Sequence, residues 1–319
     1  MLSWLARKIA GSRPTAYLTH PDCALHDMGS HHPECPARLA AIQDQLIASG
    51  LWDHLWHVEP PLVTHEQLAL VHPPRYVEAL EQLSPAEGIV HLDPDTAINR
   101  HSLRAAQRAA GAVVRATELV VNREAANAFC AVRPPGHHAE SKRAMGFCLF
   151  NNLGVGVAQA LKMGIERVAV ADFDVHHGNG TEELFHDNPR VMMVSIFQSP
   201  FYPYSGENAL GPNMHNVPLK AGSRGDALRE AVTTQWLPAL NDFKPGMIFI
   251  SAGFDAHRDD EMASMGLVED DYAWITEQLM EVAANHAEGR IVSVLEGGYD
   301  LSALGRSAAA HVRVLAGLQ

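Results

Sequence analysis

Two aspartates and a histidine alternate with other residues in the segment DFDVHHGNG, which begins at Asp172. In an extended chain, residues two apart share one face, so Asp172, Asp174 and His176 point to the same side. A further aspartate, Asp255, lies in the segment SAGFDAH. A catalytic zinc ion takes three protein ligands and leaves one position open, and Asp174, His176 and Asp255 would meet that requirement. Because oxygen-rich ligation also suits Fe²⁺, Co²⁺ and Mn²⁺, the ligand types alone do not select the metal.

Groups that move protons are expected beside such a metal, because two carboxylate ligands cancel the charge of Zn²⁺ and leave bound water harder to ionise. The segment RPPGHH ends in His137 and His138, and its prolines and glycine favour a loop that can present both imidazoles. Either can exchange protons near neutral pH, or one can simply be packed. Asp172 could orient one imidazole. Tyr299, after the two glycines of EGGYD, could donate a hydrogen bond to a developing oxyanion.

The elements that must position these side chains follow an alternating pattern from about residue 128 onward. Short apolar runs alternate with segments of helical period, which is typical of βα units around a parallel sheet. The expected strands are Thr15–Thr19, Ala128–Val132, Arg167–Asp172, Val191–Ile196, Met247–Ser251 and Arg290–Leu295. The expected helices are Arg38–Ala48, Pro74–Gln82, Ser102–Val121, Leu153–Met163, Asp226–Leu240, Glu269–Ala287 and Leu301–Leu315.

The four polar motifs each follow one of these strands. Since ligand crevices form outside the carboxyl ends of parallel strands, RPPGHH, DFDVHHGNG, SAGFDAH and EGGYD should converge. No segment has the composition of a linker. The sequence therefore predicts one α/β domain over residues 1–319, with a mostly parallel central sheet flanked by helices and one site at its edge.

Composition excludes several classes of protein. The 319 residues include 24 Lys or Arg and 37 Asp or Glu, a formal net charge of −13, which disfavours direct nucleic-acid binding. Hydrophobic residues make up 47% of the chain, enough for a large core. Four scattered cysteines without a CxxC pair, and no apolar run near the ~18 residues of a membrane span, predict a cytoplasmic protein. Residues 1–14 are expected to be an extension with a short amphipathic helix around Leu2, Leu5 and Ile9.

Longer motifs in a fixed order identify a family resemblance. The segments HHPECPAR, RPPGHHAE, GFCLFNN, VADFDVHHGNGT, SAGFDAH and LEGGYD resemble those of the zinc-dependent histone deacetylase superfamily, specifically its class II and bacterial deacetylase-like amidohydrolase members. The resemblance extends from about His20 to the C-terminus. It implies an arginase/deacetylase fold and hydrolysis of an acetyl or other acyl group from an N-acylated amine, commonly a lysine side chain.

The resemblance also implies roles for individual residues. Asp174, His176 and Asp255 look like the zinc ligands. His138 would be the principal general base and acid toward a metal-activated water, with His137 assisting electrostatically. Asp172 resembles the partner of His137, and Tyr299 the hydroxyl that polarises the amide carbonyl.

Further residues resemble the accessory sites of the family. Relatives bind K⁺ or Na⁺, which would place ligands at Asp172, Asp174, His176, Ser195 and Ile196, with a more distant set around Phe185 and Val191. Phe147 and Phe197 look like the aromatic walls of an acyl-lysine tunnel that also includes Gly146 and Met262. Arg38, Gly297 and Gly298 would line an inner cavity for the released acid.

Two positions bear on the chemistry and on substrate choice. Asn179 stands where class I members carry Asp, so the partner expected for His138 is neutral and cannot raise its pKa by charge. Met262 stands where a polyamine-selective member would carry an acidic residue, although Glu261 is adjacent. An apolar Met favours acyl-lysine or hydrophobic acyl substrates. Asp93 and Asp95 could contact a peptide at the rim or simply form a turn.

Three other interpretations assume the same pocket but assign it a different substrate, a different reaction or no reaction. One is an acetylpolyamine or small-amide hydrolase. Another is arginase-like ureohydrolysis, which needs a second metal, for which Asp259 and Asp260 are the only candidate ligands. A third is a noncatalytic acyl-lysine binder, which the full set of proton-handling groups argues against. The loops Cys23–Pro36 and Ser84–Asp95 would choose among substrates, and the sequence does not indicate the oligomeric state.

Overall fold

A parallel eight-stranded sheet forms the centre of the protein in the computed structural model, which describes residues 13–318. The strand order is β2-β1-β5-β10-β9-β6-β7-β8, and every neighbouring pair is parallel. The strands are β1 (Thr15–Leu18), β2 (Trp56–Val58), β5 (Asn127–Cys130), β6 (Val168–Asp172), β7 (Val191–Gln198), β8 (Met214–Leu219), β9 (Met247–Ala252) and β10 (Ile291–Leu295). A separate antiparallel hairpin joins β3 (Ile89–His91) to β4 (Ala97–Asn99).

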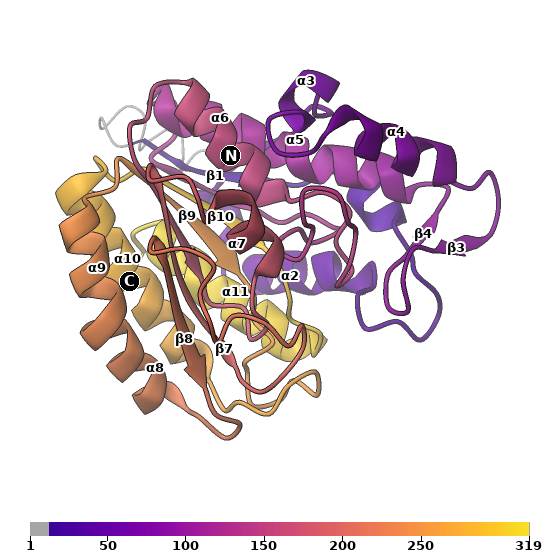
Figure 1. Ribbon diagram of the computed structural model, residues 1–319. Helices are drawn as coiled ribbons and strands as arrows, with labels where there is room; N and C mark the ends of the chain where they lie inside the picture. Colours follow the sequence, from indigo (N-terminus) through magenta and orange to yellow (C-terminus); the bar gives the residue numbers. More distant parts are fainter. Residues whose placement is uncertain (1–12, 319) are drawn as a thin grey trace.

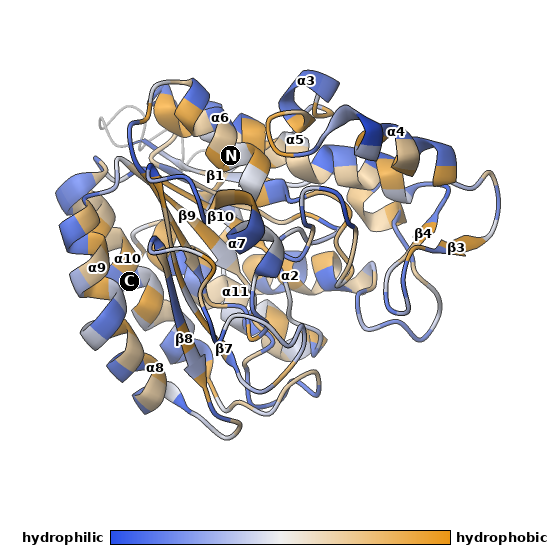
Figure 2. Ribbon diagram, in the orientation of Figure 1, coloured by the Kyte–Doolittle hydropathy of each residue, from blue (hydrophilic) through white to orange (hydrophobic). Residues whose placement is uncertain are grey.

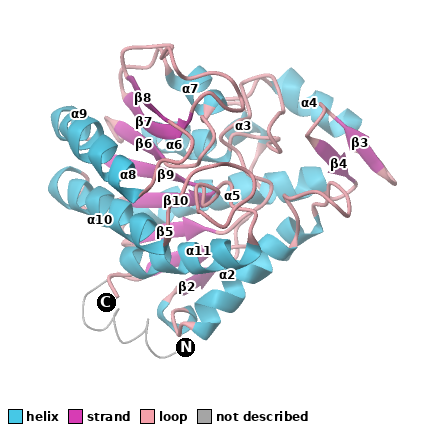
Figure 3. Cartoon of the chain, turned by 90° about the horizontal axis from the view of Figure 1, so that it is seen from below, coloured by secondary structure: helices cyan, strands magenta, loops and turns pink. Residues whose placement is uncertain are grey.

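Helices cover both faces of this sheet (Figures 1 and 3). They are α2 (Ala37–Ala48), α3 (His65–Leu68), α4 (Pro74–Leu83), α5 (Ser102–Val121), α6 (Asn152–Lys162), α7 (Asn179–Phe185), α8 (Gly225–Ala231), α9 (Leu237–Phe243), α10 (Glu269–His286) and α11 (Leu301–Leu315). The pair α5 and α6 packs on one face, and α2, α10 and α11 form a layer on the other. Because both faces are covered, the central strands are buried along their whole length and mostly apolar, as Figure 2 shows for β9.

The predicted α/β architecture is confirmed, and the central strands and most helices lie within about two residues of their expected bounds. The expected helix Asp226–Leu240 is instead α8, a π-helical segment over Val232–Trp236, and α9. Pro238 has no amide proton to donate to the preceding turn, which is a physical reason for the change in helical register.

The two edge strands, β2 and β8, were not predicted from the sequence. β2 is only three residues long. β8 contains Pro218, and a proline in a sequence argues against a strand, although an edge strand tolerates it. The short helices α3 and α7 and the β3–β4 hairpin were also not expected. The helix expected around Leu2, Leu5 and Ile9 falls outside the described residues. Within residues 13–318, no helix has both the length and the hydropathy that a membrane span requires.

Candidate active site

Three buried side chains converge beyond the carboxyl ends of β6 and β9, which are neighbouring strands. His176 Nδ1 lies 3.1 Å from Asp174 Oδ1 and 3.1 Å from Asp255 Oδ2. One ligand atom from each of the three residues lies within 4.8 Å of the others, and all three residues are buried. The structure thus brings together the three residues that the motifs predicted as metal ligands.

Backbone groups fix the two carboxylates in this arrangement. The N–H of Gly297 donates to Asp174 Oδ2 at 2.8 Å, and the N–H of Val175 donates to Asp255 Oδ1 at 3.0 Å. In each aspartate the other oxygen faces the common centre. Burial and the neighbouring charge of Asp174 raise the pKa of Asp255 to about 6, and a divalent cation between the carboxylates would oppose that rise. Two carboxylate oxygens and one imidazole nitrogen, desolvated and convergent, fit a catalytic divalent metal.

His137 is held from both its side chain and its backbone. Its Nδ1 lies 3.1 Å from Asp172 Oδ2, the partner that the resemblance implied. Burial lowers the pKa of His137, but the carboxylates of Asp174 and Asp172 outweigh it and raise the pKa to about 10. Glu296, to which the sequence assigned no role, accepts the backbone N–H of Gly136 at 2.7 Å and of His137 at 3.1 Å through Oε2. The EGGYD segment therefore anchors the tandem-histidine loop.

His138 has the opposite protonation tendency. Its Nδ1 lies 2.8 Å from Asn179 Oδ1. Burial, followed by the neighbouring His137 imidazole, holds the pKa of His138 well below its usual value. His138 therefore favours the neutral imidazole, which has a free nitrogen lone pair.

A cavity of about 250 Å³ opens onto these groups. Gly146 at its wall has a φ of +56°, and a Cβ there would lie 2.4 Å from the ring of His138, so only glycine fits. The ring centroid of Phe147 is 5.8 Å from that of Tyr299, edge to face. The lining residues are Asp95, His138, Gly146, Phe147, His176, Phe201, Tyr202, Met262 and Tyr299.

The prediction that Phe197 forms a wall of this cavity is corrected. Phe197 is buried within β7, and its ring packs on His177 at a centroid distance of 4.8 Å. The chain leaves the sheet only after Gln198, so the wall is formed by Phe201 and Tyr202. Phe201 stacks on His176 with ring centroids 5.5 Å apart. The signal that could have found them is the FYP segment just past the strand end.

Tyr299 is positioned by two buried groups. The guanidinium of Arg38 lies 4.8 Å from its ring centroid and donates to the carbonyl of Gly298 at 2.6 Å. Arg38 also donates to the carbonyl of Glu296 at 2.5 Å, so it binds the backbone on both sides of Gly297. Asp260 Oδ2 accepts the backbone N–H of Tyr299, an interaction not anticipated from the sequence. Burial raises the pKa of the Tyr299 phenol well above its usual value, so the phenol remains a donor.

The remaining acids near the cavity have other partners. Asp260 binds backbone N–H groups, and Asp259 Oδ2 pairs with Arg306 at 3.1 Å, so neither lies in the metal-ligand group. Met262 lines the cavity, whereas Glu261 is exposed in an adjoining hollow of about 250 Å³. Asp93 Oδ1 accepts the N–H groups of Asp95 and Thr96, which makes the DPDT segment a turn while Asp95 still lines the cavity.

The residues expected at monovalent-cation sites fall into two places. Asp172 of β6 pairs in register with Ser195 of β7, beside Ile196 and next to Asp174 and His176. The carbonyls of Phe185 and Val191 do converge, but both accept from the amide nitrogen of Asn213, at 2.9 and 2.7 Å.

Comparison with known proteins follows this geometry. Residues 32–315 match the histone deacetylase domain model. A probable deacetylase from Archaeoglobus fulgidus is 38% identical over 295 residues, covering 90% of this chain and 82% of that protein. A histone deacetylase-like amidohydrolase from Pseudomonas aeruginosa is 36% identical, with the same two coverages. The crystal structure of the HDA15 HD domain superposes with a TM-score of 0.91 at 33% identity, covering 96% of this chain and 90% of that one. The chain therefore belongs to the histone deacetylase family.

Proposed function

We propose that this protein is a zinc-dependent deacylase that removes acetyl or other acyl groups from N-acylated amines, with acyl-lysine as the preferred substrate. The observation that carries the proposal is the single cavity whose lining includes His176, His138 and Tyr299. His176 is a candidate metal ligand, His138 an imidazole that can accept a proton, and Tyr299 a phenol that can donate a hydrogen bond. Amide hydrolysis requires these three kinds of group around the substrate.

The substrate would enter between aromatic side chains. Phe147, Phe201 and Tyr202 present rings to the cavity, and such a channel holds the methylene chain of a lysine while excluding water. When bound by Asp174, His176 and Asp255, Zn²⁺ would supply a Lewis acid for the acyl carbonyl and an acidified water.

The chain's own groups then move the protons. His138 Nε2 takes one proton from the attacking water, and Tyr299 donates a hydrogen bond to the carbonyl oxygen as it gains negative charge. The amide C–N bond breaks as His138 returns that proton to the leaving nitrogen, so the products are a carboxylic acid and an amine. His137, held by the Asp172 carboxylate and with its ring centroid 4.0 Å from that of His138, assists electrostatically.

Acetylated polyamines are the second candidate substrate. The hollow beside Met262 is lined by Asp259, Asp260, Glu261 and Asp300, and such acidic groups suit the free ammonium of a polyamine. Against this, the side chain at the tunnel itself is the apolar Met262, which favours an acyl-lysine.

Relative kcat/KM values test the proposal. The panel contains an acetyl-lysine peptide, a longer acyl-lysine peptide and acetylated spermidine, assayed with zinc-loaded wild type and Glu261→Gln. We expect the acetyl-lysine peptide to react fastest and the variant to match wild type on it. A polyamine preference that Glu261→Gln abolishes would favour the second candidate, and no turnover of any amide would contradict both.

We also propose that the protein acts in the cytoplasm. All four cysteines are free thiols, which suits a reducing cytoplasm. The net charge of −13 suits a basic, lysine-bearing substrate and opposes a nucleic-acid partner. We also propose K⁺ or Na⁺ beside Asp172 and Ser195, where the buried Ser195 hydroxyl has no hydrogen-bond partner among residues 13–318.

A further inference from the structure

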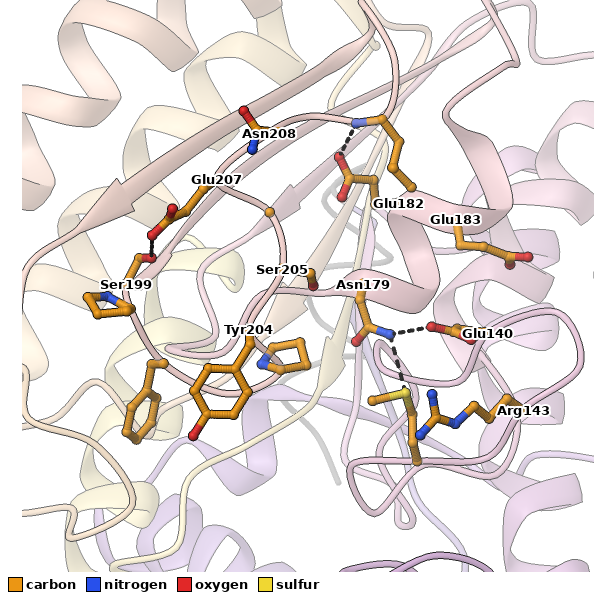
Figure 4. Close-up of a pocket in the computed structure, with 16 residues that line it drawn as sticks. Glu140, Arg143, Asn179, Glu182, Glu183, Ser199, Tyr204, Ser205, Glu207 and Asn208 are labelled. Carbon is orange, nitrogen blue, oxygen red and sulfur yellow. Dashed lines mark hydrogen bonds between the residues drawn. The ribbon is translucent and has the colours of Figure 1, made fainter.

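A second cavity, of about 550 Å³, shares Phe201 in its lining with the catalytic cavity. Figure 4 shows the amide of Asn179 pointing toward Glu140, and both residues line this cavity together with residues of the Ser199–Asn208 loop. Asn179 is also the hydrogen-bond partner of His138. A residue that lines this cavity, Asn179, therefore contacts His138 of the catalytic cavity.

The amide of Asn179 has only one satisfactory orientation. Three acceptors surround its nitrogen Nδ2: Glu140 Oε1 at 3.0 Å, Met145 Sδ at 3.4 Å and the carbonyl of His138 at 3.5 Å. An ionised carboxylate has no donor, so the group facing Glu140 must be the NH₂. The oxygen Oδ1 is then turned toward His138 Nδ1.

We propose that Glu140 is a positioning residue that fixes the tautomer of His138 by orienting the Asn179 amide. Because an amide oxygen only accepts, His138 Nδ1 must carry the proton. Nε2 is then left with a lone pair available to the substrate. No proton travels along this chain, since neither Asn179 atom exchanges one. The inference rests on the proposed function, which requires Nε2 to be the base.

If the Glu140 carboxylate is removed, we expect His138 to adopt the other tautomer, with the proton on Nε2. In Glu140→Gln, the new amide can donate as well as accept, so the shortest of the three contacts no longer selects the NH₂ and the Asn179 amide can turn by 180° in part of the molecules. Its NH₂ would then face His138 Nδ1, which must become an acceptor, and the proton moves to Nε2. That tautomer cannot take a proton from water at Nε2.

The chain supplies a matched control and a rescue. Glu207 lies in the same cavity, but its carboxylate accepts from Ser199 rather than Asn179, so Glu207→Gln makes the same charge change without touching His138. In the double variant Glu140→Gln with Asn179→Asp, a carboxylate again faces Nδ1 and restores the original tautomer without Glu140.

The experiment is ¹⁵N NMR of histidine-labelled, zinc-loaded protein, with the His138 signals assigned by their loss in His138→Gln. We expect Nδ1-protonated His138 in wild type, Glu207→Gln and the double variant, and a substantial Nε2-protonated fraction in Glu140→Gln. On an acetyl-lysine peptide, kcat should fall about 10- to 100-fold in Glu140→Gln, with KM changed less than about 2-fold, and should recover in the double variant.

Two results would overturn the inference. One is Glu140→Gln with the wild-type tautomer, whatever its activity, because the fall in kcat would then have another cause. The other is a double variant that folds but keeps the Nε2-protonated form. If Glu140→Gln fails to fold, Glu140→Ala replaces it, and a wild-type tautomer in that variant would equally overturn the inference. Failure of the proposed function is separate: wild type would hydrolyse no amide while the tautomer still responded to Glu140.

Discussion

The carboxylate of Asp260 holds the backbone of Tyr299, with Oδ2 lying 2.6 Å from the Tyr299 nitrogen and 3.0 Å from the Asp300 nitrogen. Its other oxygen, Oδ1, accepts the N–H of Met262 at 2.9 Å. One side chain thus ties the loop after β9, with the tunnel residue Met262, to the loop that carries the phenol.

Loss of this carboxylate should misplace Tyr299. For Asp260→Ala we expect kcat to fall about 10- to 100-fold with a smaller change in KM, as for other residues that orient catalytic groups. Asp260→Asn should be nearly as harmful, because both oxygens accept backbone N–H groups and an NH₂ would oppose one of them. Asp259→Ala is the control, since that side chain is partly exposed and pairs with Arg306. Equal kcat values for Asp260→Ala and Asp259→Ala would refute the role.

Removal of only the Tyr299 hydroxyl tests the phenol as an oxyanion donor. Tyr299→Phe should lower kcat about 10²- to 10³-fold, the usual cost of losing one such donor. The ring contacts with Arg38 and Phe147 remain, so zinc content and Tm should stay at wild-type values. Steady-state kinetics, metal analysis and thermal unfolding make the comparison. Wild-type turnover in the variant would remove the hydroxyl from the mechanism.

Metal removal should abolish hydrolysis reversibly. We expect a chelator to eliminate turnover and about one equivalent of Zn²⁺ per chain to restore it, because one group of ligands, Asp174, His176 and Asp255, is found among residues 13–318. Asp255→Asn should bind zinc more weakly and lose activity at limiting metal. Two tightly bound ions per active chain would instead support the ureohydrolase interpretation, and full activity without metal would contradict both.

The two phenylalanines that flank the end of β7 should respond differently to truncation. Phe201→Ala removes a wall of the catalytic cavity, so we expect KM for an acetyl-lysine peptide to rise with little change in the free energy of unfolding. Phe197→Ala leaves a hole in the core and should lower the free energy of unfolding by about 3–5 kcal/mol. Denaturant unfolding and kinetics on both variants distinguish the two roles. A higher KM in Phe197→Ala at wild-type stability would restore Phe197 to the tunnel.

His311 should make stability fall in mild acid. Burial lowers its pKa to about 3, whereas the unfolded chain has the ordinary value of about 6.5. Below pH ~6.5 the unfolded state takes up a proton that the folded state does not, so the free energy of unfolding falls by up to ~1.4 kcal/mol per pH unit until about pH 3. Above pH 7 this contribution is flat.

The variant His311→Gln isolates that contribution. Its free energy of unfolding should be lower than that of wild type at pH 7.5, because its buried bonds to Thr276 and Ser293 are perturbed. Between pH 6.5 and 4.5, however, it should depend less steeply on pH. His65→Gln, at an exposed position, should follow the wild-type slope. Parallel slopes for wild type and His311→Gln would contradict the prediction.

The parts of the fold that could be predicted are those where local pattern and burial agree. The central strands are short, mostly apolar and covered on both faces. A short apolar run such as MIFISA is therefore enough to predict the strand β9. The ligand motifs follow strand ends, and the rule for parallel sheets then brings Asp174, His176 and Asp255 together. The grouping of Asp174 with His176 was predicted from alternation in an extended segment, but β6 ends at Asp172 and a bend over residues 174–176 brings the two side chains together instead.

What could not be predicted depends on contacts between distant segments. Asp260 and Tyr299 are 39 residues apart, and Glu296 bonds the backbone of His137 at a separation of 159 residues. A carboxylate bound to backbone N–H groups leaves no pattern in sequence. The wall formed by Phe201 was missed because strand β7 continues two residues beyond its expected end, which places Phe197 in the core.

The candidate metal site is also closed off by backbone at two glycines. A Cβ on Gly253 would lie 2.0 Å from Asp174 Oδ2, and a Cβ on Gly297 would lie 2.0 Å from Asp255 Oδ2. Neither position accepts even alanine without displacing a ligand, whereas rim positions such as Glu261 border open solvent. Evolution and engineering therefore have unequal freedom here: new substrates can be explored by altering the rim, while a lineage that changes either glycine must rebuild the ligand set at the same time.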